Sequence, residues 1–266
     1  MANKYYDILR APHQVAFDIT NNCNLRCLHC FNSSGENDVI SNELSDGEVL
    51  HFIEDLASMN LYNVCFCGGE TLLRKKLVCE CIKILKPSGS HCTAVTNGLL
   101  ANPATIQQLA SAGLDGIQFS LDGLRDSHER LRNKVGIFPK VIDAMKYVLN
   151  ETELRLSIAF TPTSFNVKDF LGVYDLLVDL YKKSNRTTGS DYIDFRLQPL
   201  MLLGRAKDNP NIVPTEAQYR WLVQNINEVN LTGKCHPCID VKWGDPIDHL
   251  VRFRDTNYFM DQVSVH

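Results

Sequence analysis

The sequence predicts an α/β fold, a partial (β/α)6 barrel of the TIM-like kind with a short C-terminal extension. Strand-like and helix-like segments alternate six times between residues 15 and 229. Such alternation gives parallel strands that are joined by right-handed crossovers. A complete eight-stranded barrel takes about 250 residues, whereas the six units here end near residue 229. We therefore expect an open barrel of six strands.

The individual elements are expected from their residue patterns. Short runs rich in β-branched and aromatic residues indicate strands, and longer segments with apolar residues at helical spacing indicate helices. The expected strands are Val15–Thr20, Asn63–Cys67, His91–Thr96, Gly116–Leu121, Leu154–Thr161 and Tyr192–Gln198. The expected helices are Asp46–Met59, Leu73–Leu85, Pro103–Ala112, Phe138–Leu149, Val167–Tyr181 and Thr215–Val229.

Capping residues support several of these limits. Ser45, followed three residues later by Glu48, has the pattern of a capping box at the start of the first helix. Gly113 is expected as the C-cap of the third helix. We expect a polar loop before the fourth helix and no further β/α unit near the C-terminus. The predicted domains are therefore 1–230 for the barrel and 231–266 for the extension.

Composition indicates an ordinary globular protein. Of its 266 residues, 44% are hydrophobic and 22% are charged, and the net charge is −4. No basic field indicates nucleic acid binding, no apolar run approaches the ~20 residues of a membrane span, and no signal peptide is recognisable. We expect a cytoplasmic protein with no nucleic-acid or membrane partner. Ten cysteines in such a chain indicate reduced thiols rather than a disulfide scaffold.

Three of the cysteines stand at close spacing, Cys23, Cys27 and Cys30 in the run C-N-L-R-C-L-H-C. A structural zinc site takes four protein ligands, and an iron–sulfur cubane usually takes four cysteines. Three thiolates leave one iron of a [4Fe–4S] cluster without a protein ligand and free to bind a small molecule. A zinc site and three unrelated free thiols are the alternatives.

Polar or glycine-rich residues follow every expected strand. The three cysteines follow the first strand, G-G-E follows the second, T-N-G the third and S-L-D-G the fourth. Active sites of β/α barrels form at the C-terminal edge of the strands. We therefore expect these residues to meet at one edge of the sheet.

The C-x3-C-x2-C run, with G-G-E one β/α unit later, resembles the signature of the radical SAM superfamily. The resemblance implies a [4Fe–4S] cluster on Cys23, Cys27 and Cys30 whose open iron binds S-adenosyl-L-methionine. It implies reductive cleavage of that molecule to a 5′-deoxyadenosyl radical, which abstracts hydrogen from a substrate, and an electron donor such as flavodoxin or ferredoxin. Thr71 stands where the family usually has proline. His29 stands where it has an aromatic residue packing near the adenine.

The same resemblance implies a set of residues that bind S-adenosylmethionine. They are Gly68, Gly69, Glu70, Asn97, Ser120, Asp122 and Arg132. The glycines allow a close approach of the methionine moiety, and Glu70 pairs with its ammonium group. Ser120 and Asp122 lie near the ribose, and Arg132 meets the methionine carboxylate. A turn residue is the alternative for Asn97, and an exposed charge cluster is the alternative for Arg132.

Over residues 15–255 the chain is similar to the SPASM-type, peptide-modifying branch. Phe195–Met201 and the run G-R-A at 204–206 carry this resemblance, together with S-L-D-G. It implies a peptide or protein substrate; a small-molecule reaction in cofactor or antibiotic biosynthesis is the alternative. A non-catalytic iron–sulfur or zinc protein is the alternative of another class. The branch continues into a cysteine-rich domain, so we expect the extension to be a truncated linker, with a second cluster at Cys235 and Cys238 left open.

Overall fold

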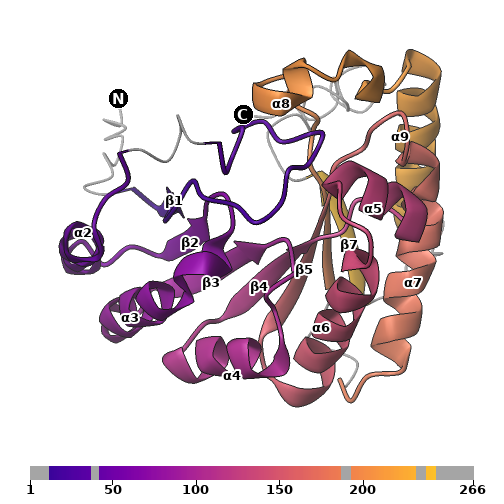
Figure 1. The fold of residues 1–266 in the computed structure, drawn as a ribbon. Helices are drawn as coiled ribbons and strands as arrows, with labels where there is room; N and C mark the ends of the chain where they lie inside the picture. Colours follow the sequence, from indigo (N-terminus) through magenta and orange to yellow (C-terminus); the bar gives the residue numbers. More distant parts are fainter. Residues whose placement is uncertain (1–11, 37–41, 187–192, 232–237, 244–266) are drawn as a thin grey trace, which may run out of the picture.

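The computed structural model describes residues 12–36, 42–186, 193–231 and 238–243 (Figure 1). Seven described strands form one parallel sheet in chain order. The helices lie along one face of this curved sheet (Figure 1). The strands are β1 Gln14–Asp18, β2 Asn63–Cys67, β3 His91–Thr96, β4 Gly116–Ser120, β5 Arg155–Phe160, β6 Ile193–Leu197 and β7 Ile239–Trp243.

The helices connect successive strands. The α-helices are α2 Asp46–Ser58, α3 Lys75–Leu85, α4 Pro103–Ala112, α5 Arg125–Arg132, α6 Ile137–Glu151, α7 Phe170–Lys182, α8 Gly204–Lys207 and α9 Glu216–Leu231. Short 3-10 turns are η1 Thr71–Arg74, η2 Lys86–Ser88, η3 Val167–Asp169 and η4 Pro210–Ile212.

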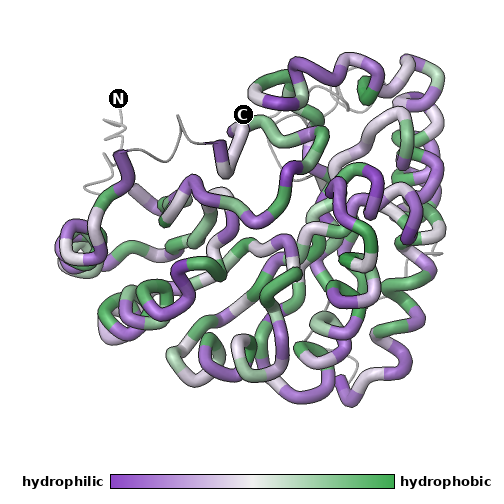
Figure 2. The backbone as a smooth tube through the Cα atoms, in the orientation of Figure 1, coloured by the Kyte–Doolittle hydropathy of each residue, from purple (hydrophilic) through white to green (hydrophobic). Residues whose placement is uncertain are grey.

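Alternation along the strands separates an apolar face from a polar one. In β6 the side chains of Ile193, Phe195 and Leu197 are buried. The ring of Phe195 stacks on Phe170 of α7 with centroids 5.7 Å apart, so the apolar face of the sheet packs against the helices. Figure 2 shows this layer as hydrophobic colouring along the strands and on parts of the helices. The core of the molecule therefore lies between the sheet and its helices.

The opposite face of the sheet is polar. Asp194 and Arg196 of β6 form an ion pair there, with 2.5 Å between Nη2 of Arg196 and Oδ2 of Asp194. They line a cavity of about 250 Å³ together with Cys65 of β2. Within that strand, the sulfurs of Cys65 and Cys67 are 3.5 Å apart. The two thiols share one face of the strand, the face toward the polar interior of the barrel, and they are half-buried.

The predicted fold class is confirmed, and several elements have the predicted limits. The strands β2 and β3 and the helix α4 begin and end at the predicted residues. The capping box is present, because the Ser45 hydroxyl accepts from the backbone of Glu48 while the Glu48 carboxylate accepts from the backbone of Ser45. Gly113 is the C-cap of α4, as expected, and its backbone has the left-handed conformation with φ 101°.

Two elements differ from the prediction. The segment expected as a polar loop before α6 contains helix α5, whose sequence R-D-S-H-E-R-L-R carries almost no apolar signal. His128 and Leu131 are nevertheless buried at helical spacing. The expected extension also supplies a seventh strand, β7, which pairs in parallel with β6 over its whole length. Its sequence I-D-V-K-W alternates like I-D-F-R-L of β6, but it is short and has no helix after it among the described residues.

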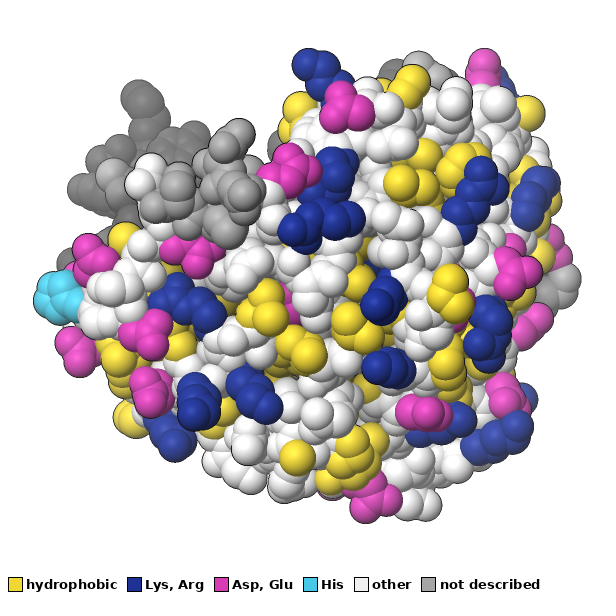
Figure 3. Space-filling view, in the orientation of Figure 1, with side chains coloured by type: hydrophobic (Ala, Val, Ile, Leu, Met, Phe, Trp, Pro, Cys, Tyr) yellow, Lys and Arg dark blue, Asp and Glu magenta, His cyan; other side chains and the backbone are white. Residues whose placement is uncertain are grey.

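The surface shows no extended field of one charge on the face that Figure 3 displays. Lysine and arginine side chains are interspersed with aspartate and glutamate over its described residues (Figure 3). In the described part of the chain, every helix is too short or too polar to cross a bilayer.

Candidate functional site

A loop that follows β1 carries the three cysteines across the C-terminal edge of the sheet (Figure 1). We call residues 19–36 the cysteine loop. Its backbone is joined to the end of β2: Ile19 N donates to Cys67 O at 3.1 Å, and Gly69 N donates to Thr20 O at 2.7 Å. Glu70 N donates to Asn22 O at 2.8 Å. The loop is thus tied to the residues that precede η1.

Gly68 and Gly69 make this attachment possible. A Cβ at Gly69 would lie 2.2 Å from the carbonyl oxygen of Asn22, and a Cβ at Gly68 would lie 2.3 Å from that of Thr20. Gly68 also has φ +140°, a backbone conformation that residues with a side chain rarely adopt. The expected reason for the glycines was a close approach of methionine; here the cysteine loop itself fills the space that a Cβ would occupy.

The three cysteines lie on this loop in different surroundings. Cys27 is buried, and Cys23 and Cys30 are half-buried. Burial raises the pKa of the Cys23 and Cys27 thiols, and the nearby Cys30 thiolate raises the pKa of both further. The Arg132 guanidinium opposes this effect at Cys27. Positive charge, such as a bound metal centre supplies, would favour the ionised form of Cys23 and Cys27.

A zinc site would hold a single ion, and only the described residues bear on it. Among them, no three or more His, Cys, Asp or Glu side chains gather around one point as a single metal ion requires. A four-iron cluster differs from a single ion because each cysteine binds a separate iron. Thiolates are the ligands such clusters take, so the donor chemistry fits. Cys235 lies outside the described residues, whereas Cys238 is buried at the start of β7.

Glu70 is buried directly beside the loop. Its Oε1 accepts from Leu72 N at 3.0 Å and from the Thr96 hydroxyl at 2.7 Å, and its Oε2 accepts from Asn97 N at 2.8 Å. Burial raises the pKa of Glu70, and these hydrogen bonds oppose that shift. The carboxylate therefore links the ends of β2 and β3, and one of its about four acceptor positions is left.

Asn97 is both a turn residue and a neighbour of the cysteines. Its Oδ1 accepts from Leu99 N at 3.0 Å, which is the turn interaction that the alternative predicted. Its Nδ2 donates to Asn24 Oδ1 at 2.8 Å and lies 4.0 Å from Cys23 Sγ. Asn97 thus closes one side of the cysteine loop.

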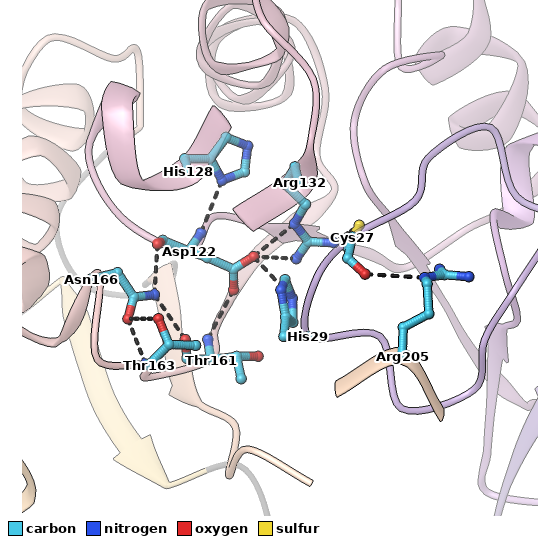
Figure 4. A network of polar contacts seen from close by, with 9 residues as sticks. All are labelled: Cys27, His29, Asp122, His128, Arg132, Thr161, Thr163, Asn166 and Arg205. Carbon is cyan, nitrogen blue, oxygen red and sulfur yellow. Dashed lines mark hydrogen bonds and ion pairs between the residues drawn. The ribbon is translucent and has the colours of Figure 1, made fainter. Parts of the chain in front are cut away.

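Asp122 and Arg132 form a buried ion pair under the other side of the loop (Figure 4). Arg132 Nε and Nη2 lie 2.7 Å and 2.5 Å from Oδ2 of Asp122, which is fully buried. Burial opposes ionisation of Asp122, but Arg132 and two nearby histidines hold its pKa below the usual value. The third nitrogen, Nη1, lies 3.7 Å from Cys27 Sγ. The pair therefore connects the end of β4 with a cysteine.

Two histidines, His29 and His128, complete this network (Figure 4). His29 Nε2 lies 3.4 Å from Oδ2 of Asp122, and burial lowers the pKa of His29 to about 4. His128 Nδ1 accepts from Asp122 N at 3.0 Å, and burial lowers its pKa to about 3. Both rings are thus neutral at pH 7. His29, which is expected near the adenine, packs its largely buried side chain against Asp122.

Not every expected residue joins these contacts. Ser120 is the half-buried last residue of β4, and no hydrogen bond among the described residues joins it to Glu70 or Arg132. Two residues that the sequence did not single out hold the loop. Glu43 accepts from the Thr20 hydroxyl at 2.8 Å. Arg205 donates to the carbonyl of Cys27 at 3.2 Å (Figure 4). Arg205 belongs to the G-R-A run, which could have indicated it from the sequence. No motif in the sequence indicates Glu43.

Comparisons with known proteins show which family the chain belongs to. The profile of the Radical SAM superfamily matches residues 17–177. The AdoMet-dependent heme synthase of Methanosarcina barkeri is 27% identical over 85% of this chain and 63% of its own length. The mycofactocin maturase MftC of Mycolicibacterium smegmatis is 30% identical over 85% of this chain and 55% of its own. Among solved structures, Streptococcus suis SuiB bound to precursor peptide SuiA matches with a TM-score of 0.65 and 18% identity, covering 87% of this chain and 49% of SuiB.

The chain thus spans roughly half to two thirds of each of these three proteins. The profile extends from the end of β1 into α7, including the cysteine loop and the buried pair beneath it. Because that match extends over more than half of the sequence, the chain belongs to the radical SAM superfamily, whose enzymes use a [4Fe–4S] cluster and S-adenosyl-L-methionine.

Proposed function

We propose that Cys23, Cys27 and Cys30 hold the [4Fe–4S] cluster and that this protein cleaves S-adenosylmethionine reductively. The observation that carries the proposal is the single loop that bears three thiols at the C-terminal edge of the sheet, fixed by backbone hydrogen bonds to the G-G-E segment. When bound, the two cofactors supply a 5′-deoxyadenosyl radical that abstracts hydrogen from a substrate. A flavodoxin or a ferredoxin is the proposed electron donor.

The residues around the loop have capacity left for the second cofactor. Glu70 has one acceptor position that none of its three donors uses, and an ammonium group is a suitable partner for it. Arg132 has five N–H groups, of which three point to Asp122 and Cys27. The remaining two suit a carboxylate. Gly68, Gly69, Asn97, Ser120 and Asp122 are proposed to complete the binding site, with Asp122 acting through Arg132 rather than on the ribose.

A peptide or protein is the proposed substrate. Support comes from the likeness in fold to SuiB, which was crystallised with a precursor peptide, and from the strand-six and S-L-D-G segments. A small-molecule reaction is the second candidate, because a heme synthase is 27% identical over 85% of the chain. The barrel interior suits polar groups of either class, since Asp194 and Arg196 line its cavity.

The proposed cleavage is tested by assaying 5′-deoxyadenosine by mass spectrometry after anaerobic reconstitution with a chemical reductant. We expect product from the wild type and none from Cys23→Ala. Glu70→Gln keeps the shape of the side chain but removes its charge, and we expect weaker binding of S-adenosylmethionine. Glu48→Gln, on the exposed start of α2, is the matched control. Product from Cys23→Ala, or equal binding by Glu70→Gln, would contradict the proposed site.

The substrate class is tested in the same assay. Peptide pools and iron porphyrins are added separately, and deuterated forms report transfer of deuterium into 5′-deoxyadenosine. We expect the peptide pools to increase turnover and to transfer deuterium. Transfer from a porphyrin alone would favour the small-molecule candidate.

A further inference from the structure

The guanidinium of Arg132 contacts an anion on one side and a cysteine sulfur on the other. Nε and Nη2 face Oδ2 of Asp122 at 2.7 Å and 2.5 Å, and Nη1 faces Cys27 Sγ at 3.7 Å (Figure 4). The side chain of Arg132 is 11% exposed and that of Asp122 is 0% exposed. Little water therefore separates the three groups or screens their charges.

Asp122 is fixed from several sides, so it determines where the arginine points. Its Oδ1 accepts from Thr161 N at 2.9 Å, at the end of β5. Its backbone carbonyl accepts from Asn166 Nδ2 at 2.7 Å, and its backbone N–H donates to His128 Nδ1 at 3.0 Å. A guanidinium is a planar fork, so two contacts to a fixed carboxylate also fix the direction of Nη1. That direction is toward Cys27.

We propose that Arg132, oriented by Asp122, raises the reduction potential of the iron–sulfur cluster by presenting an N–H group and a positive charge to Cys27 Sγ. The inference rests on the proposed function, because it requires the cluster to be bound through Cys27. It is a different role from binding the methionine carboxylate, for which other N–H groups of Arg132 remain. Asp122 acts in it as a positioning residue.

The direction of the effect follows from charge. Reduction adds one negative charge to the cluster and its thiolates, so a nearby cation and a hydrogen-bond donor stabilise the reduced form more than the oxidised form. Hydrogen bonds to the sulfurs are a recognised determinant of such potentials. The Asp122 carboxylate, on the far side of the guanidinium, acts in the opposite direction.

The test is an anaerobic redox titration of the reconstituted protein, followed by the EPR signal of the reduced cluster, with no S-adenosylmethionine present. Without that molecule, a residue that only binds its carboxylate leaves the potential unchanged. For Arg132→Gln we expect at least a threefold fall in the ratio of reduced to oxidised cluster at a fixed potential. This fall corresponds to a midpoint about 28 mV more negative for one electron.

Two further variants separate this effect from a loosened loop. Arg130→Gln removes the same charge from α5, where Arg130 lies over the ring of Phe165 at 3.6 Å from its centroid, and we expect a smaller shift. Asp122→Asn removes the carboxylate charge but keeps an oxygen that can accept from Arg132. We expect it to shift the midpoint to less negative values. A loosened loop would shift Arg132→Gln and Asp122→Asn in the same direction.

Iron and sulfide contents are measured for every variant. If Arg132→Gln or Asp122→Asn fails to take up iron, Arg132→Lys and Asp122→Glu replace them, because each keeps its charge. Arg132→Lys keeps the positive charge but loses the planar fork, so we expect its midpoint potential to lie between those of the wild type and Arg132→Gln. Midpoints equal to wild type, shifts of equal sign, or loss of the cluster in all four variants would overturn the inference. Absence of a cluster from the wild type would instead overturn the proposed function.

Discussion

Replacing Gly69 by alanine should displace the cysteine loop. A Cβ at this position would lie 2.2 Å from the carbonyl oxygen of Asn22 and 2.7 Å from that of Asn21. Carbon–oxygen contacts ordinarily begin at about 3.3 Å, so the loop has to move by about 1 Å. Both of these oxygens belong to backbone, which cannot rotate aside as a flexible side chain can.

The movement affects two backbone hydrogen bonds, Gly69 N to Thr20 O at 2.7 Å and Glu70 N to Asn22 O at 2.8 Å. At about 0.5–1.5 kcal/mol each, their loss costs about 1–3 kcal/mol. Alanine gains back about 0.4–1 kcal/mol through the unfolded chain. We expect a net loss of up to about 2.6 kcal/mol in the free energy of unfolding and a larger proportional loss of bound iron.

The assay combines urea unfolding of the apoprotein with iron and sulfide analysis after reconstitution. Gly47→Ala is the matched control, because Gly47 lies in the first turn of α2 with no atom within 4 Å of an added Cβ. It should gain up to about 1 kcal/mol and keep its iron. Full iron content and unchanged stability in Gly69→Ala would refute the reasoning that the glycines exist to seat the loop.

Two further predictions concern stability. Burial lowers the pKa of His128 to about 3, so the folded state keeps this ring neutral while the unfolded chain takes up a proton below about pH 6.5. The stabilisation is present above the unfolded pKa and is lost as pH falls toward the folded one, at about 1.4 kcal/mol per pH unit. Urea midpoints of His128→Gln between pH 7 and pH 5 should therefore fall less steeply than those of the wild type; parallel slopes would contradict a buried neutral ring. Ser45→Ala removes the capping box of α2 and should cost about 0.5–2 kcal/mol while iron content stays at the wild-type value. Loss of iron in this variant would mean that the start of α2 helps to shape the cysteine loop.

Most of the fold could be predicted from the sequence because its signals are local. β2 and β3 alternate apolar and polar residues, and α4 is bounded by Asn102 and Gly113, so their limits follow from periodicity and capping. Helix α5 has no such signal, since its stability depends on the burial of His128 and Leu131 by other segments. The strand β7 depends on an edge that β6 offers only after the sheet has formed.

The sequence indicates which residues gather at the site, but not which contacts their side chains make. Motif spacing brought the three cysteines, Glu70 and Asn97 to one edge of the sheet, because the ends of parallel strands meet there. The spacing of a motif cannot show that a carboxylate forms an ion pair with another side chain of the same protein. The sequence did not indicate that Asp122 is fully buried against Arg132, ten residues later in the chain. Contacts of this kind depend on the three-dimensional packing of α5 against the loop.

The central claim is that three cysteines hold one four-iron cluster. The most direct measurement is iron and acid-labile sulfide per chain after anaerobic reconstitution, for the wild type and for Cys23→Ala. We expect about four irons with matching sulfide in the wild type and their loss in the variant. Zinc without sulfide in the wild type, or an undiminished cluster in Cys23→Ala, would contradict it.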